Sequence, residues 1–219
     1  MRCLVVGVCV LMACMPHPEP GARSPRQHAL VIAVQPLADV PHELLDSARV
    51  AIETRHSATV LTMPQRELPG NAFTKVRTPR YRADTLIAWL RGIRPDSVDL
   101  IIGITAKDIS ITKRDAFSRI KAPAWKYRDF GVFGLGYIGG PSCMVSTYRL
   151  GNPDGQRYFD RLKKIVVHEL GHNRALPHCP DTACVMRDAV ERISSIDAAG
   201  ASFCAACLQR LDDGKNGGR

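Results

Sequence analysis

Residues 168–178 place three histidines and a glutamate at the spacing of a metal site. His168 and His172 are four residues apart, which on an α-helix corresponds to about 40° of rotation and about 6 Å of rise. Both imidazoles then project from one side of consecutive turns and can bind one zinc ion at about 2.0–2.1 Å. Glu169 lies about 100° around the helix from its neighbour. It can therefore approach a metal-bound water without binding the metal itself.

The third histidine requires the helix to end soon after His172. In a continuous helix His178 would lie about 15 Å along the axis from the first histidine. The metzincin pattern H-E-x-x-H-x-x-G-x-x-H turns the chain at a glycine, and that position here is Ala175. If the turn needs a positive φ, alanine costs about 1–2 kcal/mol; the alternative is a turn with a different φ at 175. Pro177 cannot continue a helix, so it favours the turn and partly replaces the glycine.

Four further cysteines, close together in the sequence, begin directly after the third histidine: Cys179, Cys184, Cys204 and Cys207. Four thiolates complete a tetrahedral site with no open position, which is the structural arrangement for zinc, whereas three histidines leave a position for water. Two disulfides are an alternative that an exported protein would favour, and C-x-x-C is also a redox pattern. Cys143 stands alone and is expected to be a small buried apolar side chain.

Together these residues resemble the signature of the archaemetzincin family of zinc metalloproteases, in the metzincin clan. The match runs from His168 through Met186 to Cys207, and the segments YRADTLIAWL, VFGLGYIGG and VSTYRL resemble the family's N-terminal half. The resemblance implies a compact α/β zincin-like fold: a mixed twisted sheet with helices, including the metal-binding helix, and a small cysteine-zinc C-terminal lobe. It also implies two zinc ions, with Met186 beneath the catalytic one. The ligands would be His168, His172 and His178 for the catalytic zinc, and Cys179, Cys184, Cys204 and Cys207 for the structural zinc.

The expected activity is zinc-dependent hydrolysis of a peptide or protein substrate, with Glu169 as general base for a zinc-activated water. We expect an extended substrate to pair with a strand from residues 138–148. The alternative is a non-catalytic or degenerate zinc-binding protein, which Ala175 would favour by moving His178 off the metal. A nucleic-acid-binding zinc finger is a further alternative. Between Cys184 and Cys207, however, only Arg187 and Arg192 are strongly positive, so no nucleic-acid partner is expected.

Strand and helix patterns alternate along the chain, which predicts a layered α/β arrangement. The segment Gly134–Gly139 matches G-x-G-x-x-G, but a β-branched segment opened by proline follows it where a nucleotide site needs a helix. We therefore interpret it as a glycine-rich hairpin or bend. Strands are predicted at 28–37, 57–64, 97–105 and in two halves of 130–150, and helices at 41–56, 81–93 and 157–174.

The first residues differ in kind from the rest. Arg2 precedes an apolar stretch from Cys3 to Ala13, which is too short to span a bilayer and is typical of an export signal. Leu11–Cys14 resembles a bacterial lipobox, which predicts a lipidated Cys14 and an exported, membrane-anchored or periplasmic monomer; the alternative is a cytoplasmic protein. The predicted organisation is a signal at 1–13, a flexible tether at 14–28 and an archaemetzincin-like domain at 29–219, with lobes at 29–178 and 179–211.

Bulk composition adds one constraint. The chain has 219 residues, 45% hydrophobic and 23% charged, which suits one globular domain. The formal net charge of +9 favours acidic partners such as nucleic acid, anionic lipid or acidic peptides. Because Lys and Arg are scattered along the sequence, we expect a dispersed, solvated basic surface.

Overall fold

The computed structural model describes residues 29–153, 155–188 and 192–217. The predicted signal and tether, with Cys14, lie outside these residues, so export and lipidation stay predictions. Among the described residues, no helix combines the length and apolar character needed to cross a membrane.

A five-stranded sheet forms the centre of the molecule, as the alternating pattern predicts. Four strands are parallel, and the last one, at the edge, is antiparallel to its neighbour. In spatial order the strands are β2 (Thr59–Thr62), β1 (Val31–Leu37), β5 (Leu100–Thr105), β9 (Ser142–Ser146) and β8 (Gly134–Gly136).

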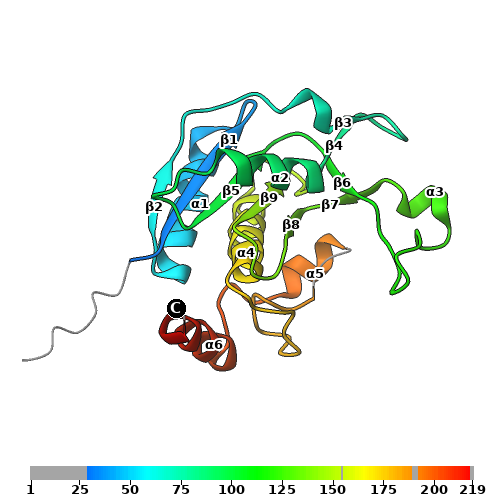
Figure 1. The fold of residues 1–219 in the computed structure, drawn as a ribbon. Coiled ribbons are helices and arrows are strands. Elements are labelled where there is room, and N and C mark those ends of the chain that lie inside the picture. Colours follow the sequence, from blue (N-terminus) through cyan, green and yellow to red (C-terminus); the bar gives the residue numbers. More distant parts are fainter. Residues whose placement is uncertain (1–28, 154, 189–191, 218–219) are drawn as a thin grey trace, which may run out of the picture.

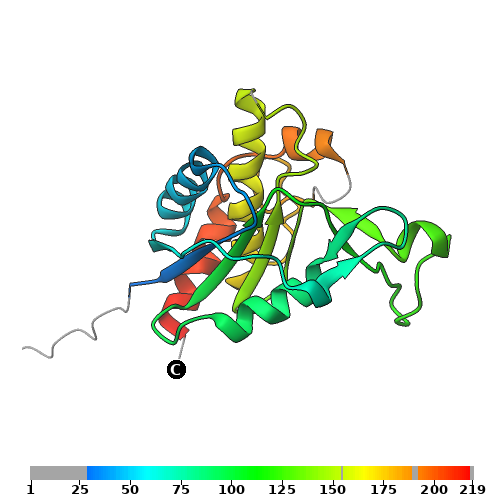
Figure 2. The ribbon, with the colours of Figure 1, turned by 90° about the horizontal axis from the view of Figure 1, so that it is seen from above.

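Helices cover both faces of this sheet. On one face lie α1 (His42–His56) and α4 (Gln156–Asn173), with the C-terminal α6 (Ala205–Gly217) below these helices, and on the other face lies α2 (Ala83–Ile93), as Figures 1 and 2 show. Alternate residues of β5 serve the two layers: Ile102 and Ile104 pack toward α1 and α4, whereas Ile101 packs toward α2. Burial on both faces explains why these strands are continuous apolar runs.

A second, smaller sheet was not predicted from the sequence. Its strands are two or three residues long, too short to show a period of two. They are β3 (Phe73–Thr74), β4 (Arg80–Arg82), β6 (Ile109–Ile111) and β7 (Phe130–Val132), with η1 (Gly70–Ala72) before them and α3 (Ala124–Tyr127) in the β6–β7 connection. In both ribbon views this sheet and α3 extend to one side of the main sheet.

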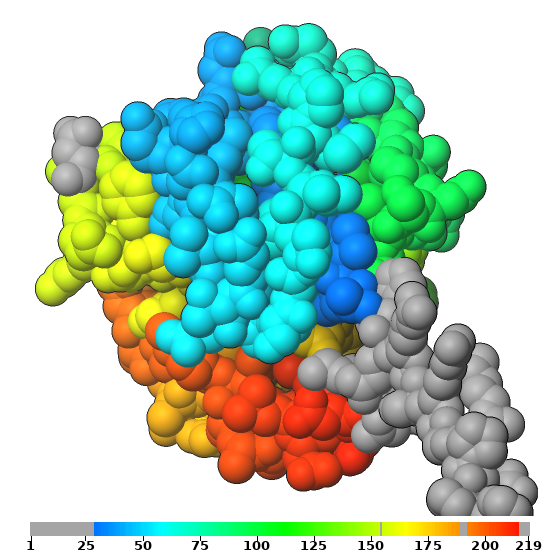
Figure 3. Space-filling view, turned by 90° about the vertical axis from the view of Figure 1, so that its left-hand side faces the viewer, coloured from blue at the N-terminus to red at the C-terminus, as the bar shows by residue number. Residues whose placement is uncertain are grey.

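The C-terminal segment packs beneath the central helices as a small lobe. It contains the cysteine-rich turn after α4, the short α5 (Ile193–Ala198) and α6. The edge of the His56 ring meets Phe203 with ring centroids 5.3 Å apart, which joins the end of α1 to this lobe. Figure 3 shows the orange and red C-terminal surface directly against the blue and cyan surface of α1 and β2.

The glycine-rich segment forms the predicted hairpin. Strands β8 and β9 pair antiparallel, and Gly139 between them has a φ of 71°. Strand β9, not a helix, follows the glycines, so the reason for rejecting a nucleotide site holds.

Candidate metal centre

The long helix α4 carries the H-E-x-x-H residues in its last two turns. His168 and His172 are buried there, and their ring centroids lie 4.6 Å apart. The apolar residues of α4 pack into the core beneath the sheet, including Leu162, Val166 and Leu170. This packing fixes the rotation of the helix, and with it the side on which both imidazoles project.

The helix ends in a left-handed turn at Ala175, whose φ is 64°. The N–H of Ala175 donates to the carbonyl of His172 at 2.9 Å, and the N–H of Leu176 donates to the carbonyl of Gly171 at 3.0 Å. These two bonds define a Schellman motif with alanine at the position where glycine is usual. The turn brings His178 back, with its ring centroid 5.3 Å from that of His168.

The ring nitrogens that His168, His172 and His178 can offer to a metal all lie within 4.8 Å of one another. Nδ1 of His168 donates to the carbonyl of Val185 at 2.8 Å, and Nδ1 of His172 donates to the carbonyl of Leu176 at 2.8 Å. Because a carbonyl only accepts, the proton of each neutral ring is on Nδ1 and the lone pair is on Nε2. Burial lowers the pKa of His168 to about 4 and lowers that of His172, which keeps both rings neutral.

The side chain of Glu169 extends from α4 toward the edge strand β8. A Cβ on Gly134 would lie 2.6 Å from Oε1 of Glu169, and one on Gly136 would lie 2.6 Å from its backbone oxygen. Both glycines therefore permit a close approach that no other residue allows. Burial raises the pKa of Glu169 to about 8, although a hydrogen bond from the Gly136 N–H opposes this. A cation in the histidine cluster would favour the ionised carboxylate.

The four clustered cysteines also converge, with all sulfurs within 4.8 Å of one another. Sγ of Cys179 lies 3.7 Å from Sγ of Cys204, and Sγ of Cys184 lies 3.8 Å from Sγ of Cys207. A tetrahedron with zinc–sulfur distances of about 2.3 Å has edges of about 3.8 Å, so these separations suit a shared metal. They are well above the bond length of a disulfide, about 2.05 Å.

The segment that follows Cys184 links the cysteine cluster to the histidine cluster. Val185 provides the carbonyl that binds His168, and it lies next to Cys184 in the chain. Met186 is fully buried, and a Cβ on Gly171 would overlap its sulfur. Glycine within H-E-x-x-H therefore makes room for the methionine below the helix.

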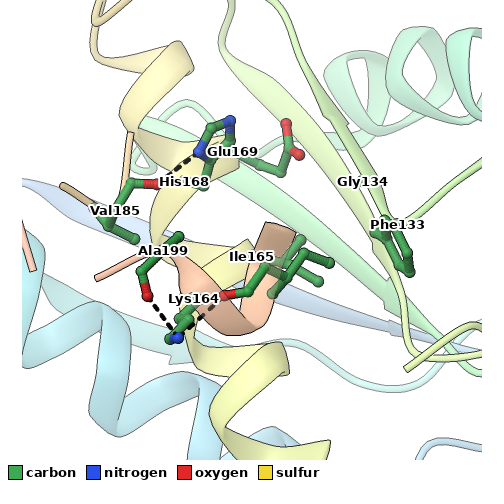
Figure 4. Close-up of a pocket in the computed structure, with 9 residues that line it drawn as sticks. Phe133, Gly134, Lys164, Ile165, His168, Glu169, Val185 and Ala199 are labelled. Atoms are coloured by element: carbon green, nitrogen blue, oxygen red, sulfur yellow. Dashed lines mark hydrogen bonds between the residues drawn. The ribbon is translucent and has the colours of Figure 1, made fainter. Parts of the chain in front are cut away.

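An apolar pocket opens beside His168 and Glu169 (Figure 4). The only cation in its wall, Lys164, donates to three carbonyls at the end of α5, those of Ile196, Asp197 and Ala199, at 3.1, 3.0 and 2.6 Å. Because these carbonyls hold the ammonium, it is not free to bind an anionic group of a substrate. The pocket is lined by Phe133, Gly134, Lys164, Ile165, His168, Glu169, Val185, Ile196 and Ala199.

The prediction of which strand pairs with the substrate needs correction. Residues 138–148 were expected to supply the strand beside the substrate, but β9 (Ser142–Ser146) lies inside the sheet between β5 and β8. The edge strand beside α4 is β8, at Gly134–Gly136. Glycines form strands poorly, so β8 was predicted only as half of a glycine-rich hairpin and not as the strand beside Glu169. Glycine within a strand also marks a close approach by another group, and that signal would have found the contact with Glu169.

Comparison with known proteins agrees with this geometry. A family model for Peptidase family M54 matches residues 42–213. The archaemetzincin of Haloquadratum walsbyi is 29% identical over 192 residues, covering 83% of this chain and 99% of its own. That of Methanopyrus kandleri is 34% identical over 145 residues, covering 66% of this chain and 73% of its own.

Solved archaemetzincin structures have the same fold. The crystal structure from Methanopyrus kandleri superposes with a TM-score of 0.70 at 27% identity, covering 88% of this chain and 98% of that one. The structure from Archaeoglobus fulgidus, complexed with malonate, gives 0.65 at 25% identity, covering 83% and 99%. With most of the chain inside the family match and the fold shared, this chain belongs to Peptidase family M54 and is a zinc metallopeptidase.

Proposed function

We propose that His168, His172 and His178 hold a catalytic zinc ion and that Glu169 is the general base for peptide-bond hydrolysis. The observation that carries the proposal is the tautomer of two rings. Backbone carbonyls hold Nδ1 of His168 and His172, so both rings present the Nε2 lone pair to the cluster. Such orientation of ligands by their outer partners is typical of zinc sites.

We further propose a second, structural zinc bound by Cys179, Cys184, Cys204 and Cys207, which makes two ions per chain. The sulfur separations of 3.7 and 3.8 Å fit a tetrahedral thiolate site. The backbone N–H groups of Met186 and Cys204 both lie 3.4 Å from Sγ of Cys184, where they stabilise a thiolate. Because Val185 joins this cluster to His168, the second ion would also fix a catalytic ligand.

His168, His172 and His178 would hold the zinc ion, which when bound would supply a lowered pKa for water and polarisation of the scissile carbonyl. Glu169 accepts the proton of the attacking water and delivers it to the leaving amine. Its enclosure by Gly134 and Gly136 limits the carboxylate to a narrow range of positions. The hydrogen bond from the Gly136 N–H supports the ionised form that accepts the proton.

The substrate side of the proposal rests on β8 and the apolar pocket. An extended peptide pairs with an exposed sheet edge through backbone hydrogen bonds, so affinity there is largely independent of sequence. The pocket beside His168 then selects one side chain next to the scissile bond. Since Lys164 is held by carbonyls and the remaining walls are mainly apolar, we propose an apolar residue at that position of the peptide.

The alternative of a degenerate zinc-binding protein depended on Ala175. That reading required the alanine turn to leave His178 away from the other two histidines. With a φ of 64° at Ala175, the ring centroid of His178 lies 4.9 Å from that of His172, so this feature no longer favours the alternative.

Replacing Glu169 by Gln tests the mechanism. The change keeps the size of the side chain and all metal ligands but removes the proton acceptor, so zinc content should stay at two per chain while hydrolysis is lost. Glu67→Gln, at an exposed position, is the matched control and should keep parental activity. Peptide-library cleavage followed by mass spectrometry measures both activity and the residue preference. Parental turnover in Glu169→Gln would refute the assigned role.

A further inference from the structure

Most of the net positive charge of this protein lies in one lobe, although its basic residues are scattered along the sequence. Residues 73–79 and 112–128, which we call the basic lobe, contain eight lysines and arginines and one acidic residue. They therefore carry a net charge of +7, out of +9 for the whole chain. The basic residues are dispersed, as expected, but the net charge is not, because two segments far apart in the sequence fold together.

A cation–π contact joins the two segments, and backbone hydrogen bonds order the longer one. The guanidinium of Arg77 lies 5.2 Å from the ring centroid of Trp125, which connects the β3–β4 turn to α3. Within the longer segment, the N–H of Lys113 donates to the carbonyl of Tyr127 at 2.9 Å, and that of Lys121 donates to Lys113 at 3.0 Å. The charges are therefore presented from an ordered scaffold of backbone hydrogen bonds.

Little in the lobe neutralises this charge. Its one acidic side chain, Asp115, is held by Arg119, with Oδ2 3.0 Å from NH2. Seven basic side chains are exposed to solvent: Lys75, Arg77, Arg114, Arg119, Lys121, Lys126 and Arg128.

Two large aromatic side chains project among these cations. Phe117 is 78% exposed and Trp125 is 67% exposed. A guanidinium lies over each ring, that of Arg119 at 5.1 Å from the Phe117 centroid and that of Arg77 at 5.2 Å from the Trp125 centroid. An exposed aromatic with a cation beside it matches the boundary of a bilayer, where rings lie at headgroup depth and cations meet phosphate.

We propose that the basic lobe docks on a bilayer surface rich in anionic phospholipids, with Trp125 and Phe117 entering the headgroup layer. Charge complementarity carries the choice of partner, because clustered Lys and Arg bind anionic lipid surfaces. Single-stranded nucleic acid is disfavoured because it needs open ring faces along a groove. Here arginines cover ring faces, and the lobe extends away from the main sheet in both ribbon views.

Trp125 provides a direct readout. Trp89 is the only other tryptophan, so a full-length chain with Trp89→Phe and Cys14→Ser reports on Trp125 alone and carries no lipid. Binding to phosphatidylcholine vesicles is compared with binding to vesicles that also contain one-quarter phosphatidylglycerol. Any binding through the apolar N-terminal stretch contributes to both measurements, so the difference reports on the anionic lipid. We expect at least tenfold stronger partitioning to the anionic vesicles, a blue shift of emission, and quenching by brominated lipids.

A matched pair of double variants locates the effect. Lys121→Gln with Lys126→Gln removes two charges from the basic lobe, and Arg55→Gln with Arg91→Gln removes two exposed charges from α1 and α2. At roughly fivefold for each cation, the lobe variant should partition more than tenfold more weakly, and the control less than threefold. Equal losses in both variants, or no preference for anionic vesicles, would overturn the proposal. So would lobe-dependent binding of a single-stranded oligonucleotide in the absence of vesicle binding.

Discussion

The carbonyl of Leu176 accepts a hydrogen bond from Nδ1 of His172 at 2.8 Å, so the turn that ends α4 also orients one of the helix's own metal-site histidines. The turn exists because Ala175 adopts a φ of 64°, a conformation that glycine reaches without steric cost. The conformation of residue 175 is therefore coupled to the position of two histidines: His172 through Leu176, and His178 by chain direction.

Ala175→Gly should be neutral or stabilise the protein by up to about 1 kcal/mol, because the strain it relieves exceeds the chain entropy it adds. Zinc affinity should hold or rise. Ser57→Gly is the matched control: Ser57 has a φ of 51° at the end of α1 and should gain stability without any change in zinc affinity. Thermal unfolding and competition with a chromophoric chelator measure the two effects. A clear loss of stability in Ala175→Gly would show that the alanine turn is unstrained.

Gly134→Ala should lower kcat by about 10²-fold with both metals retained, because displacing a catalytic group by about 1 Å has effects of this size. The new Cβ would lie 2.6 Å from Oε1 and 2.7 Å from Cγ of Glu169, so the carboxylate must move. Gly92→Ala, where the added Cβ meets open space, is the control and should leave kcat unchanged. Steady-state kinetics with metal analysis separates the outcomes; unchanged kcat in Gly134→Ala would mean that Glu169 acts from another position.

The histidine cluster and the main sheet were predictable from the sequence for physical reasons. A helix of five turns with apolar residues on one face shows its period, and parallel strands buried on both faces show as apolar runs. A turn between His172 and His178 followed from the need to return His178 to the metal site, and the structure makes it with a left-handed φ at Ala175. Strands β3, β4 and β6 were not predictable, because strands of two or three residues are stabilised by partners distant in the sequence. Strand β7 lies in the predicted segment 130–150, but the sheet that it joins was not predicted.

Two further features of the molecule were not predictable for the same reason. The concentration of charge in residues 73–79 and 112–128 depends on tertiary contacts such as that between Arg77 and Trp125. Which strand lies at the sheet edge depends on topology, and β8 consists of two glycines and one leucine. In both cases the local sequence is compatible with several arrangements, and long-range pairing selects one of them.

Cys204→Ser should lose one of two zinc ions and lower the Tm by more than about 10 °C, because a structural metal contributes directly to folding. Cys143→Ala, at a buried cysteine outside the cluster, should keep both ions and lose only packing energy. Metal analysis and calorimetry with and without reductant check this. An unchanged Tm with full zinc content would rule out the thiolate site, and a Tm that falls only with reductant would favour disulfides.

His56 should make the protein less stable as the pH falls below about 6.5. Its ring is buried, its Nε2 donates to the carbonyl of Val167 at 3.2 Å, and Nδ1 accepts from Arg174 at 3.3 Å. Burial, followed by the Arg174 charge, lowers its pKa from 6.5 to about 3. Above pH 6.5 both folded and unfolded states hold a neutral ring, so there is no effect. Between pH 6.5 and about 3 only the unfolded state takes the proton, and stability is lost at about 1.4 kcal/mol per pH unit.

A variant isolates this contribution from that of the metal-site histidines, which both proteins share. His56→Gln should be less stable than the parent at pH 7.5, because it loses packing against Phe203. The gap should then narrow by about 2 kcal/mol by pH 5, since only the parent releases a proton from residue 56 on folding. His42→Gln, at an exposed position on the same helix, controls for the loss of any histidine. Urea unfolding of the zinc-saturated proteins at each pH gives the two curves. If they run parallel from pH 7.5 to 5, then His56 is protonated equally in both states and the Arg174 contact does not hold it neutral.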